Sequence, residues 1–162
     1  LASVKIRGQN IEPSRYVYIG LLVIGMAGQY TGGKLSERMP PEKALVGGFV
    51  SLGVLSVLFV PAATSGLVVL LVSTGILGFV LFGQQPLLQS VVADYSGSDV
   101  RGLSYGYMFF GVFGVGALGA AFSGAILAYT TQQVLFLLLA VVPVIAALIS
   151  AVLWKRLPPQ TA

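Results

Sequence analysis

The chain has 162 residues and a net charge of +4, and it is 56% hydrophobic but only 9% charged, with a mean hydropathy of +0.93. Soluble domains carry about a quarter charged residues, so this composition excludes an ordinary soluble protein and indicates an integral membrane protein. Cysteine and histidine are absent, which excludes disulfides, thiol chemistry, histidine catalysis and the usual zinc sites, and we expect no metal, no cofactor and no enzymatic activity.

Residues 1–15 form a mixed polar segment ahead of the first apolar run. Ser14 stands just before that run and is predicted to cap the first helix. We expect the segment to be an extracytoplasmic loop or tail. The chain begins with Leu1 and lacks the basic region and short apolar region of a signal peptide. The sequence is therefore either a processed chain or a fragment of a longer protein, and we favour the fragment.

Three stretches without any charged residue follow, at 16–33, 44–93 and 102–154. A helix needs roughly 20 apolar residues to cross the hydrocarbon core of a bilayer, so the second and third stretches are each long enough for two crossings. Turn residues at 61–66 and 129–133 divide them. We therefore predict an all-α, polytopic membrane helix bundle with five transmembrane helices, at about 16–33, 44–60, 66–93, 102–128 and 134–154. The apolar runs are continuous and lack the alternation of barrel strands.

The basic residues predict the orientation of these five spans. Six lie on one side of the membrane, namely Lys34, Arg38, Lys43, Arg101, Lys155 and Arg156, against Lys5, Arg7 and Arg15 on the other. The positive-inside rule then makes the loops 34–43 and 94–101 and the tail 155–162 cytoplasmic. We expect a cell membrane, plasma or inner, with lipid as a partner and the tail after Trp154 disordered. Because the basic residues are scattered among short loops, we expect no nucleic-acid partner.

The loop after the first span resembles motif A of the major facilitator superfamily. Its first part is matched by Gly33, Leu35, Ser36, Glu37 and Arg38. Pro40, Pro41 and Glu42 stand in place of the glycine and basic pair of the second part, as expected for the weaker copy that the family carries in its C-terminal half.

A second resemblance lies further along the chain. The segment Gln85–Asp94 is similar to the tenth helix of that family, the residues after it are similar to the following cytoplasmic loop, and Arg101–Gly106 is similar to the start of the eleventh helix. The five spans align with helices eight to twelve. The resemblance implies part of the C-terminal six-helix half of a permease, with helices one to seven, and thus the N-terminal half, missing. It implies secondary active or facilitative transport of a small-molecule substrate by alternating access. The alternative is a non-transporting five-span scaffold or assembly subunit.

Polar residues inside the spans form stripes at helical spacing. The candidates for a substrate cavity are Tyr18, Gln29, Thr74, Gln85, Gln89 and Tyr107. A glutamine that faces lipid is costly, so these stripes should face protein or water. The polar side chains could either form interhelical hydrogen bonds that hold the bundle together or line a cavity and contact substrate. The resemblance implies that the first, third and fourth spans line the cavity. No Asp, Glu, Lys or Arg lies inside a span, so proton coupling would need a carboxylate in the missing part, and facilitated diffusion is equally open.

The fourth span carries a row of small residues, Gly116, Ala120 and Gly124, which predicts close helix packing and leaves room for helices to slide. The GxGxxG match at 114–119 is not a dinucleotide site, because no strand precedes it and no acidic residue follows it. At the cytoplasmic ends of the spans, we hypothesise that Glu37, Arg38 and Asp94 form an ion-pair network that stabilises the outward-facing state. Arg101 is grouped with this candidate gate.

Overall fold

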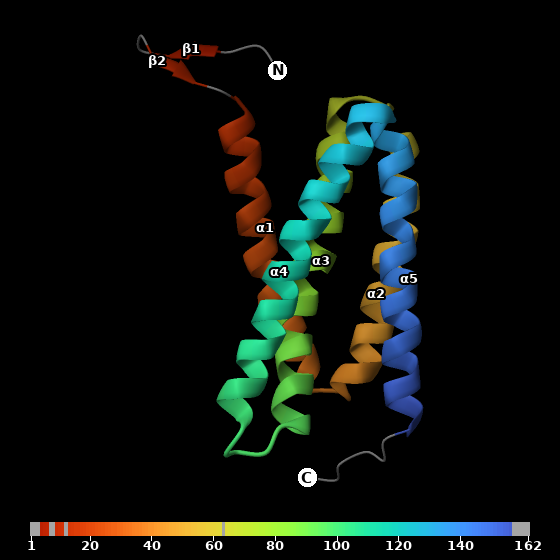
Figure 1. Ribbon diagram of the computed structural model, residues 1–162. Helices are drawn as coiled ribbons and strands as arrows, with labels where there is room; N and C mark the ends of the chain where they lie inside the picture. The colour runs from red at the N-terminus through yellow and green to blue at the C-terminus, as the bar shows by residue number, and fades with distance from the viewer. Residues whose placement is uncertain (1–3, 7–8, 12, 63, 157–162) are drawn as a thin grey trace.

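Five helices make up the bundle. The computed structural model describes residues 4–6, 9–11, 13–62 and 64–156, so the predicted disorder of the tail falls largely outside the described residues. The helices are α1 (Pro13–Ser36), α2 (Pro41–Ala62), α3 (Leu67–Tyr95), α4 (Arg101–Tyr129) and α5 (Gln132–Arg156). They run alternately up and down, as short connections between spans require (Figure 1).

The helices confirm the all-helical membrane bundle. Four of them, α2 to α5, are long and apolar enough to cross a membrane. Helix α1, with 24 residues, does not reach that level of hydropathy among the described residues. Its second half contains Gln29, Tyr30, Thr31 and several glycines, which dilute the apolar residues of its first half. Pro86 and Pro143 lie inside α3 and α5, and both helices continue through them.

The N-terminal segment contains two short strands. Strands β1 (Val4–Ile6) and β2 (Gln9–Ile11) pair in antiparallel fashion, with Val4 opposite Ile11. β-Branched residues at these positions favour extended backbone, a short signal that the polar composition of the segment obscured. Helix α1 then begins at Pro13, the first helical position that proline favours, so Ser14 lies inside the first turn and is not its cap.

Helices α1 and α3 approach until their backbones touch. A Cβ atom on Gly28 would meet the carbonyl oxygen of Phe79, and one on Gly32 would meet the carbonyl oxygen of Gly83. A Cβ atom on Gly25 would lie 2.7 Å from the ring of Phe82. Lipid supplies no hydrophobic drive between helices, so close backbone approach through small residues is how such pairs gain contact energy.

The second tight pair, α2 and α5, packs through side chains. The rings of Phe59 and Phe136 have centroids 4.4 Å apart, and a Cβ atom on Gly53 would lie 3.5 Å from Val144. The two pairs are joined where α2 meets α3, around the buried side chains of Ala44, Leu45 and Leu87. This cluster lies at the end of the bundle that holds the α1–α2 and α3–α4 connections.

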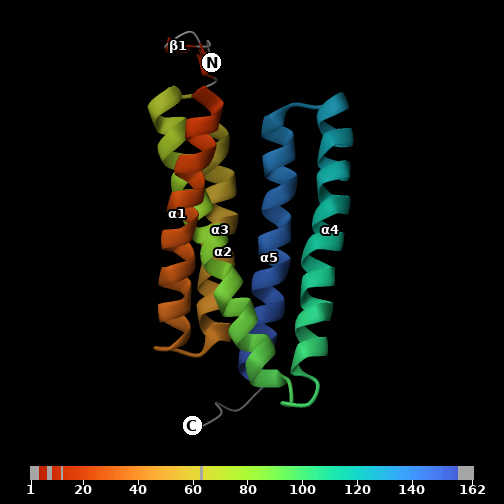
Figure 2. The same ribbon diagram turned by 90° about the vertical axis from the view of Figure 1, so that its left-hand side faces the viewer.

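Helix α4 lies at the edge of the bundle and has no buried residue. Figure 2 shows it beyond α5 and near α3 only at their connecting loop, where the Tyr105 hydroxyl donates to the Gln89 carbonyl at 3.2 Å. A Cβ atom on Gly116 or Gly124 would meet nothing within 4 Å, and Ala120 is exposed. Within the described chain, the close packing through glycine is therefore made by α1, and the packing role of the α4 row stays a prediction.

The glycine contacts of α1 generate a test. Gly28→Ala and Gly32→Ala should each destabilise the fold by about 1–3 kcal/mol, because the carbonyl oxygens opposite them belong to a helix backbone and cannot rotate away. The measurement is the free energy of unfolding of the protein in mixed micelles. Gly20→Ala on the same helix is the control, since its Cβ atom meets nothing within 4 Å. Equal losses at all three positions would contradict the proposed α1–α3 interface.

Candidate functional site

The charged residues of the bundle gather at one end, which we call the basic end. It is formed by the α1–α2 turn, the α3–α4 loop and the end of α5, and lies at the bottom of Figure 1. Its basic residues with described side chains are Lys34, Arg38, Lys43, Arg101 and Lys155, and all five are exposed. The alternating helix directions bring these residues together from segments that are far apart in the sequence.

The segment that resembles motif A forms a tight turn at the close of α1. The Ser36 hydroxyl donates to the Gly33 carbonyl at 2.7 Å, and the backbone N–H groups of Arg38 and Met39 both donate to the Leu35 carbonyl at 3.1 Å. Leu35 is half-buried and packs against the Ala44–Leu45–Leu87 cluster. The leucine of this segment therefore anchors the turn to the core.

The acidic and basic residues of the same turn face outward. Glu37, Arg38 and Asp94 are all exposed, and no ion pair within 4.0 Å joins them in the part of the chain that the structure describes. Arg101 donates instead to the Ala93 carbonyl at 3.3 Å. The hypothesised network is thus not formed in this conformation, because the turn after α1 directs its charged side chains into open space.

A different contact links the two connections at the basic end. The Tyr95 hydroxyl, at the end of α3, donates a short hydrogen bond to Oε1 of Glu42 in the first turn of α2. Glu42 is only 9% exposed, whereas Tyr95 is 42% exposed. The N-terminus of a helix favours a negative charge, which gives Glu42 a further reason to lie there. Sequence analysis missed this pair, although an acidic residue directly after Pro41 is a recognisable signal for a helix start.

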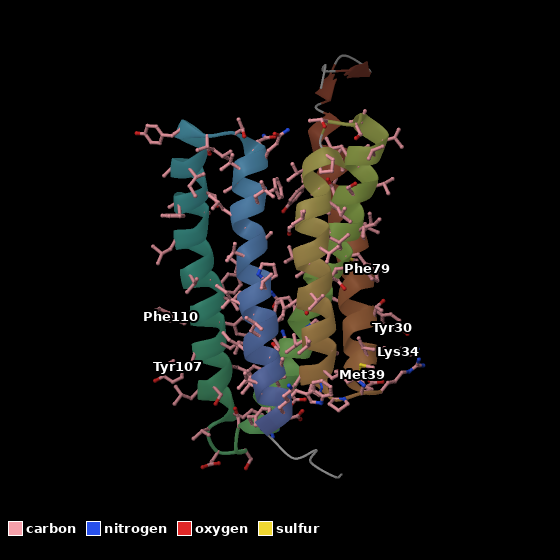
Figure 3. The ribbon with its side chains drawn as sticks, turned by 90° about the vertical axis from the view of Figure 1, so that its right-hand side faces the viewer. Tyr30, Lys34, Met39, Phe79, Tyr107 and Phe110 are labelled. Carbon is pink, nitrogen blue, oxygen red and sulfur yellow. The ribbon has the colours of Figure 1, made fainter. Side chains whose placement is uncertain are left out.

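On α1 and α4, the predicted cavity residues are exposed. Tyr18, Gln29 and Tyr107 all face away from their neighbouring helices. Gln29 lines a shallow pocket of about 380 Å³ on α1 with Tyr30, Gly33, Lys34 and Glu37. Figure 3 shows Tyr30 and Lys34 pointing outward on one side and Tyr107 and Phe110 pointing outward on the other.

The predicted cavity residues of α3 are half-buried. The Thr74 hydroxyl donates to the Leu70 carbonyl at 2.7 Å, a bond within its own helix. Gln85 and Gln89 are half-buried, and Gln89 contributes its backbone carbonyl to the contact with Tyr105. The six candidates from α1, α3 and α4 are not gathered into one pocket of the described chain.

The residue that sequence analysis passed over is Gln84, the neighbour of Gln85. Only 6% of Gln84 is exposed, and it lines a pocket of about 420 Å³ among α1, α2 and α3. Its Nε2 donates to the Val80 carbonyl at 3.1 Å, while its Oε1 has no partner among the described residues. Helical spacing could have predicted that Gln84 is buried, because Gln84 shares a face of α3 with Val80 and the buried Leu87.

Two further observations bear on the chemistry of the site. Among the described residues, no group of three or more acidic, cysteine or histidine side chains could hold a metal ion.

In comparisons with known proteins, residues 15–162 match the family model described as Major Facilitator Superfamily. No curated protein and no solved structure matches the chain.

The contact between Tyr95 and Glu42 generates a second prediction. Tyr95→Phe removes the hydroxyl and leaves a nearly buried carboxylate without this donor, so the free energy of unfolding should fall by about 1–3 kcal/mol. Tyr107→Phe is the matched control, because Tyr107 is 69% exposed and points away from the bundle. The measurement is unfolding in mixed micelles, and the same loss in both variants would show that the bond does not hold α2 to α3.

Proposed function

Because this chain belongs to the Major Facilitator Superfamily, whose members move small solutes across membranes, we propose that it forms most of the C-terminal half of a transporter that works by alternating access. Helices α1 to α5 then correspond to helices eight to twelve of the complete transporter. The remaining helices, including the whole N-terminal half, would come from protein outside this sequence. Transporters of this kind hold substrate near the bilayer midplane between two such halves.

The open face of α4 is the observation that carries this proposal. Large side chains stand out from it along its length, with Tyr107, Phe110 and Phe113 all more than two-thirds exposed. Between them lie small residues whose neighbouring space is empty. Lipid satisfies apolar side chains, but rows of small residues are typical of surfaces on which another helix packs closely. This surface therefore suits the helices of the rest of the transporter.

The polar residues of the spans support a cavity shared with those helices. Gln29 and Tyr18 on α1 and Tyr107 on α4 are exposed where lipid alone would leave their polar groups without partners. Gln85 and Gln89 on α3 are half-buried between these helices. A lining of uncharged Gln, Thr and Tyr side chains suits an uncharged solute, or an organic acid whose charge is matched by the other half. Any coupling carboxylate would also lie in that half.

The basic end would face the cytoplasm of a plasma or inner membrane, with the C-terminus inside. The concentration of Lys and Arg side chains at that end supports this orientation under the positive-inside rule. In the intact transporter, Glu37, Arg38 and Asp94 would meet when the cytoplasmic side closes. They are free to do so because all three are exposed in the present conformation.

A five-span scaffold or assembly subunit is the alternative function. The same open face of α4 would then bind another membrane protein, and Gln29 and Gln85 would face protein or lipid rather than water. Solvent access to these glutamines separates the two functions, and the 162 residues of this chain contribute no cysteine that would react with the label.

Cysteine scanning tests the transport proposal in the full-length protein in membranes. Gln29→Cys and Gln85→Cys should react with a membrane-impermeant maleimide, because a transport cavity fills with water. Val50→Cys is the control, since Val50 is 51% exposed on the apolar face of α2 and should stay unlabelled in lipid. Labelling no faster than that of the control would favour the scaffold.

The gate hypothesis has its own test. Arg38→Ala should bias the transporter toward the inward-open state, so Gln85→Cys should become more accessible to reagent added from the cytoplasmic side. An exposed ion pair contributes only about 0–1 kcal/mol, so the expected increase is at most about fivefold. Lys34→Ala removes a nearby exposed charge of the same sign and serves as the control. An unchanged labelling rate in Arg38→Ala, or an equal change in both variants, would remove the gating role.

A further inference from the structure

A long apolar groove runs between α2 and α5. It encloses about 560 Å³, and we call it the α2–α5 groove. Its floor is made of small residues, among them Gly53, Ala140 and Ala147, and all three are buried. Valine and leucine side chains form its walls, and those of Val54 and Leu148 are more than half exposed. Because every residue that lines the groove is apolar, the lining suits an apolar ligand.

The length of the groove is close to the depth of one bilayer leaflet. At about 1.5 Å per helical residue, the lining of α2 from Val46 to Leu58 extends about 18 Å. The hydrocarbon core is about 30 Å thick, so one leaflet contributes about 15 Å of it. The groove begins near the basic end, at Val46 and Ala151. An acyl chain of the leaflet at the basic end can therefore lie along nearly its whole length.

A basic and an aromatic side chain stand where the groove opens at the basic end. Lys43 lies one turn before Val46, on the face of α2 that lines the groove. Trp154 lies one turn after Ala151 on α5, and the exposed Lys155 follows it. The Lys43 ammonium lies over the Trp154 ring, 5.7 Å from its centroid. We call Lys43, Trp154 and Lys155 the mouth of the groove. Tryptophan favours the membrane–water interface, so the mouth lies at the level of the lipid headgroups.

The mouth carries positive charge on the side of the bundle formed by α2 and α5. Glu42 precedes Lys43 in the sequence, but its carboxylate accepts the hydrogen bond of Tyr95 on α3. The ammonium groups of Lys43 and Lys155 thus stand beside an apolar groove without a carboxylate between them and its opening. This combination of a cationic mouth and an apolar groove is complementary to a ligand with an anionic head and an apolar chain.

The groove lies apart from the surfaces assigned to transport. None of the six predicted cavity residues belongs to α2 or α5. In Figure 3, α2 and α5 lie side by side between α4 and α1, and Tyr107 and Phe110 of the open α4 face point away from both. Helices that pack on that face of α4 would therefore leave the α2–α5 groove open to lipid.

We propose that the α2–α5 groove binds an acyl chain of an anionic phospholipid, whose phosphate contacts the ammonium groups of Lys43 and Lys155. The small residues of the floor let the chain approach the helix backbones closely and gain dispersion contacts. An ammonium group has three donors, so that of Lys43 can contact the Trp154 ring and a phosphate together. A zwitterionic lipid also carries a cationic group, which both ammonium groups repel. The site requires that the helices lie in a bilayer and does not rest on the transport proposal.

Trp154, the only tryptophan of this chain, reports which lipid lies at the mouth. The full-length protein is placed in phosphatidylcholine nanodiscs that contain a minor fraction of brominated phosphatidylglycerol or brominated phosphatidylcholine. Both probes carry bromine on the acyl chains near the glycerol, where it quenches tryptophan fluorescence on contact. The emission of Trp154 is the difference between the protein and the same protein with Trp154→Phe, so tryptophans outside this sequence cancel. Each lysine near the surface favours anionic lipid about fivefold, so phosphatidylglycerol should be preferred about 25-fold.

Two lysine variants connect this preference to the mouth. Lys43→Gln and Lys155→Gln should each lower the preference for phosphatidylglycerol about fivefold. Lys34→Gln is the matched control, because Lys34 is also an exposed lysine of the basic end but lies on α1, beside Tyr30. It should leave the preference unchanged. All three variants alter exposed side chains, so the bundle should keep its fold.

A further variant connects the preference to the groove. Ala151→Leu fills the groove next to Trp154 while both lysines of the mouth stay in place, and it should lower the preference at least fivefold. A preference that survives Ala151→Leu would show that the lysines attract anionic lipid without the groove, which would overturn the site.

Two other results would also overturn the proposal. Equal quenching by the two brominated lipids would show that no anionic lipid is selected, as when a helix from the rest of the protein covers the groove. Equal losses in Lys34→Gln and Lys43→Gln would show a general effect of surface charge. Labelling of Gln29→Cys and Gln85→Cys tests transport separately, so failure of one proposal leaves the other in place.

Discussion

The direct contact between the backbones of α1 and α3 is the constraint on which the rest of this structure depends. Gly28 and Gly32 bring the two helices together at points where any side chain would collide with a carbonyl oxygen. This contact sets how far Leu35 reaches into the cluster with Ala44 and Leu87, and hence where the turn after α1 lies. Gly28 and Gly32 also line the pocket of about 420 Å³ that lies among α1, α2 and α3. In a bilayer, such contacts take the place of the hydrophobic drive that holds soluble cores together.

The helices differ in how they are held, and this difference is relevant to movement. Helices α1 and α3 are locked by backbone contacts, and α2 and α5 by interlocked side chains such as Phe59 and Phe136. Helix α4 has neither kind of contact along most of its length and meets α3 near their connecting loop through Tyr105. A helix that has no buried residue and is open along one face is suited to packing against further helices and to changing its tilt.

Among the described residues, hydrogen bonds rather than ion pairs hold the basic end together. Tyr95 and Glu42 join the α3–α4 connection to the start of α2, while Glu37, Arg38 and Asp94 stay exposed. Neutral donors to a nearly buried carboxylate avoid the cost of removing two opposite charges from water. The exposed charges thereby remain available for partners outside the described chain.

The sequence by itself determined the environment, the number of helices and the family. Runs without charge longer than a bilayer crossing leave no other class of fold, and the segments around Gly33–Arg38 and Gln85–Gly106 carry the resemblance that the family match confirmed. Only the tertiary structure decided which faces meet. Helical periodicity shows that Gln84 and Gln85 lie on different faces of α3, but it does not show that the face of Gln84 meets α2. Likewise, glycines are frequent in both α1 and α4, yet those of α1 make the close contacts. The reason is physical: periodicity describes one helix at a time, whereas burial and hydrogen-bond partners depend on a neighbouring helix from a distant part of the chain.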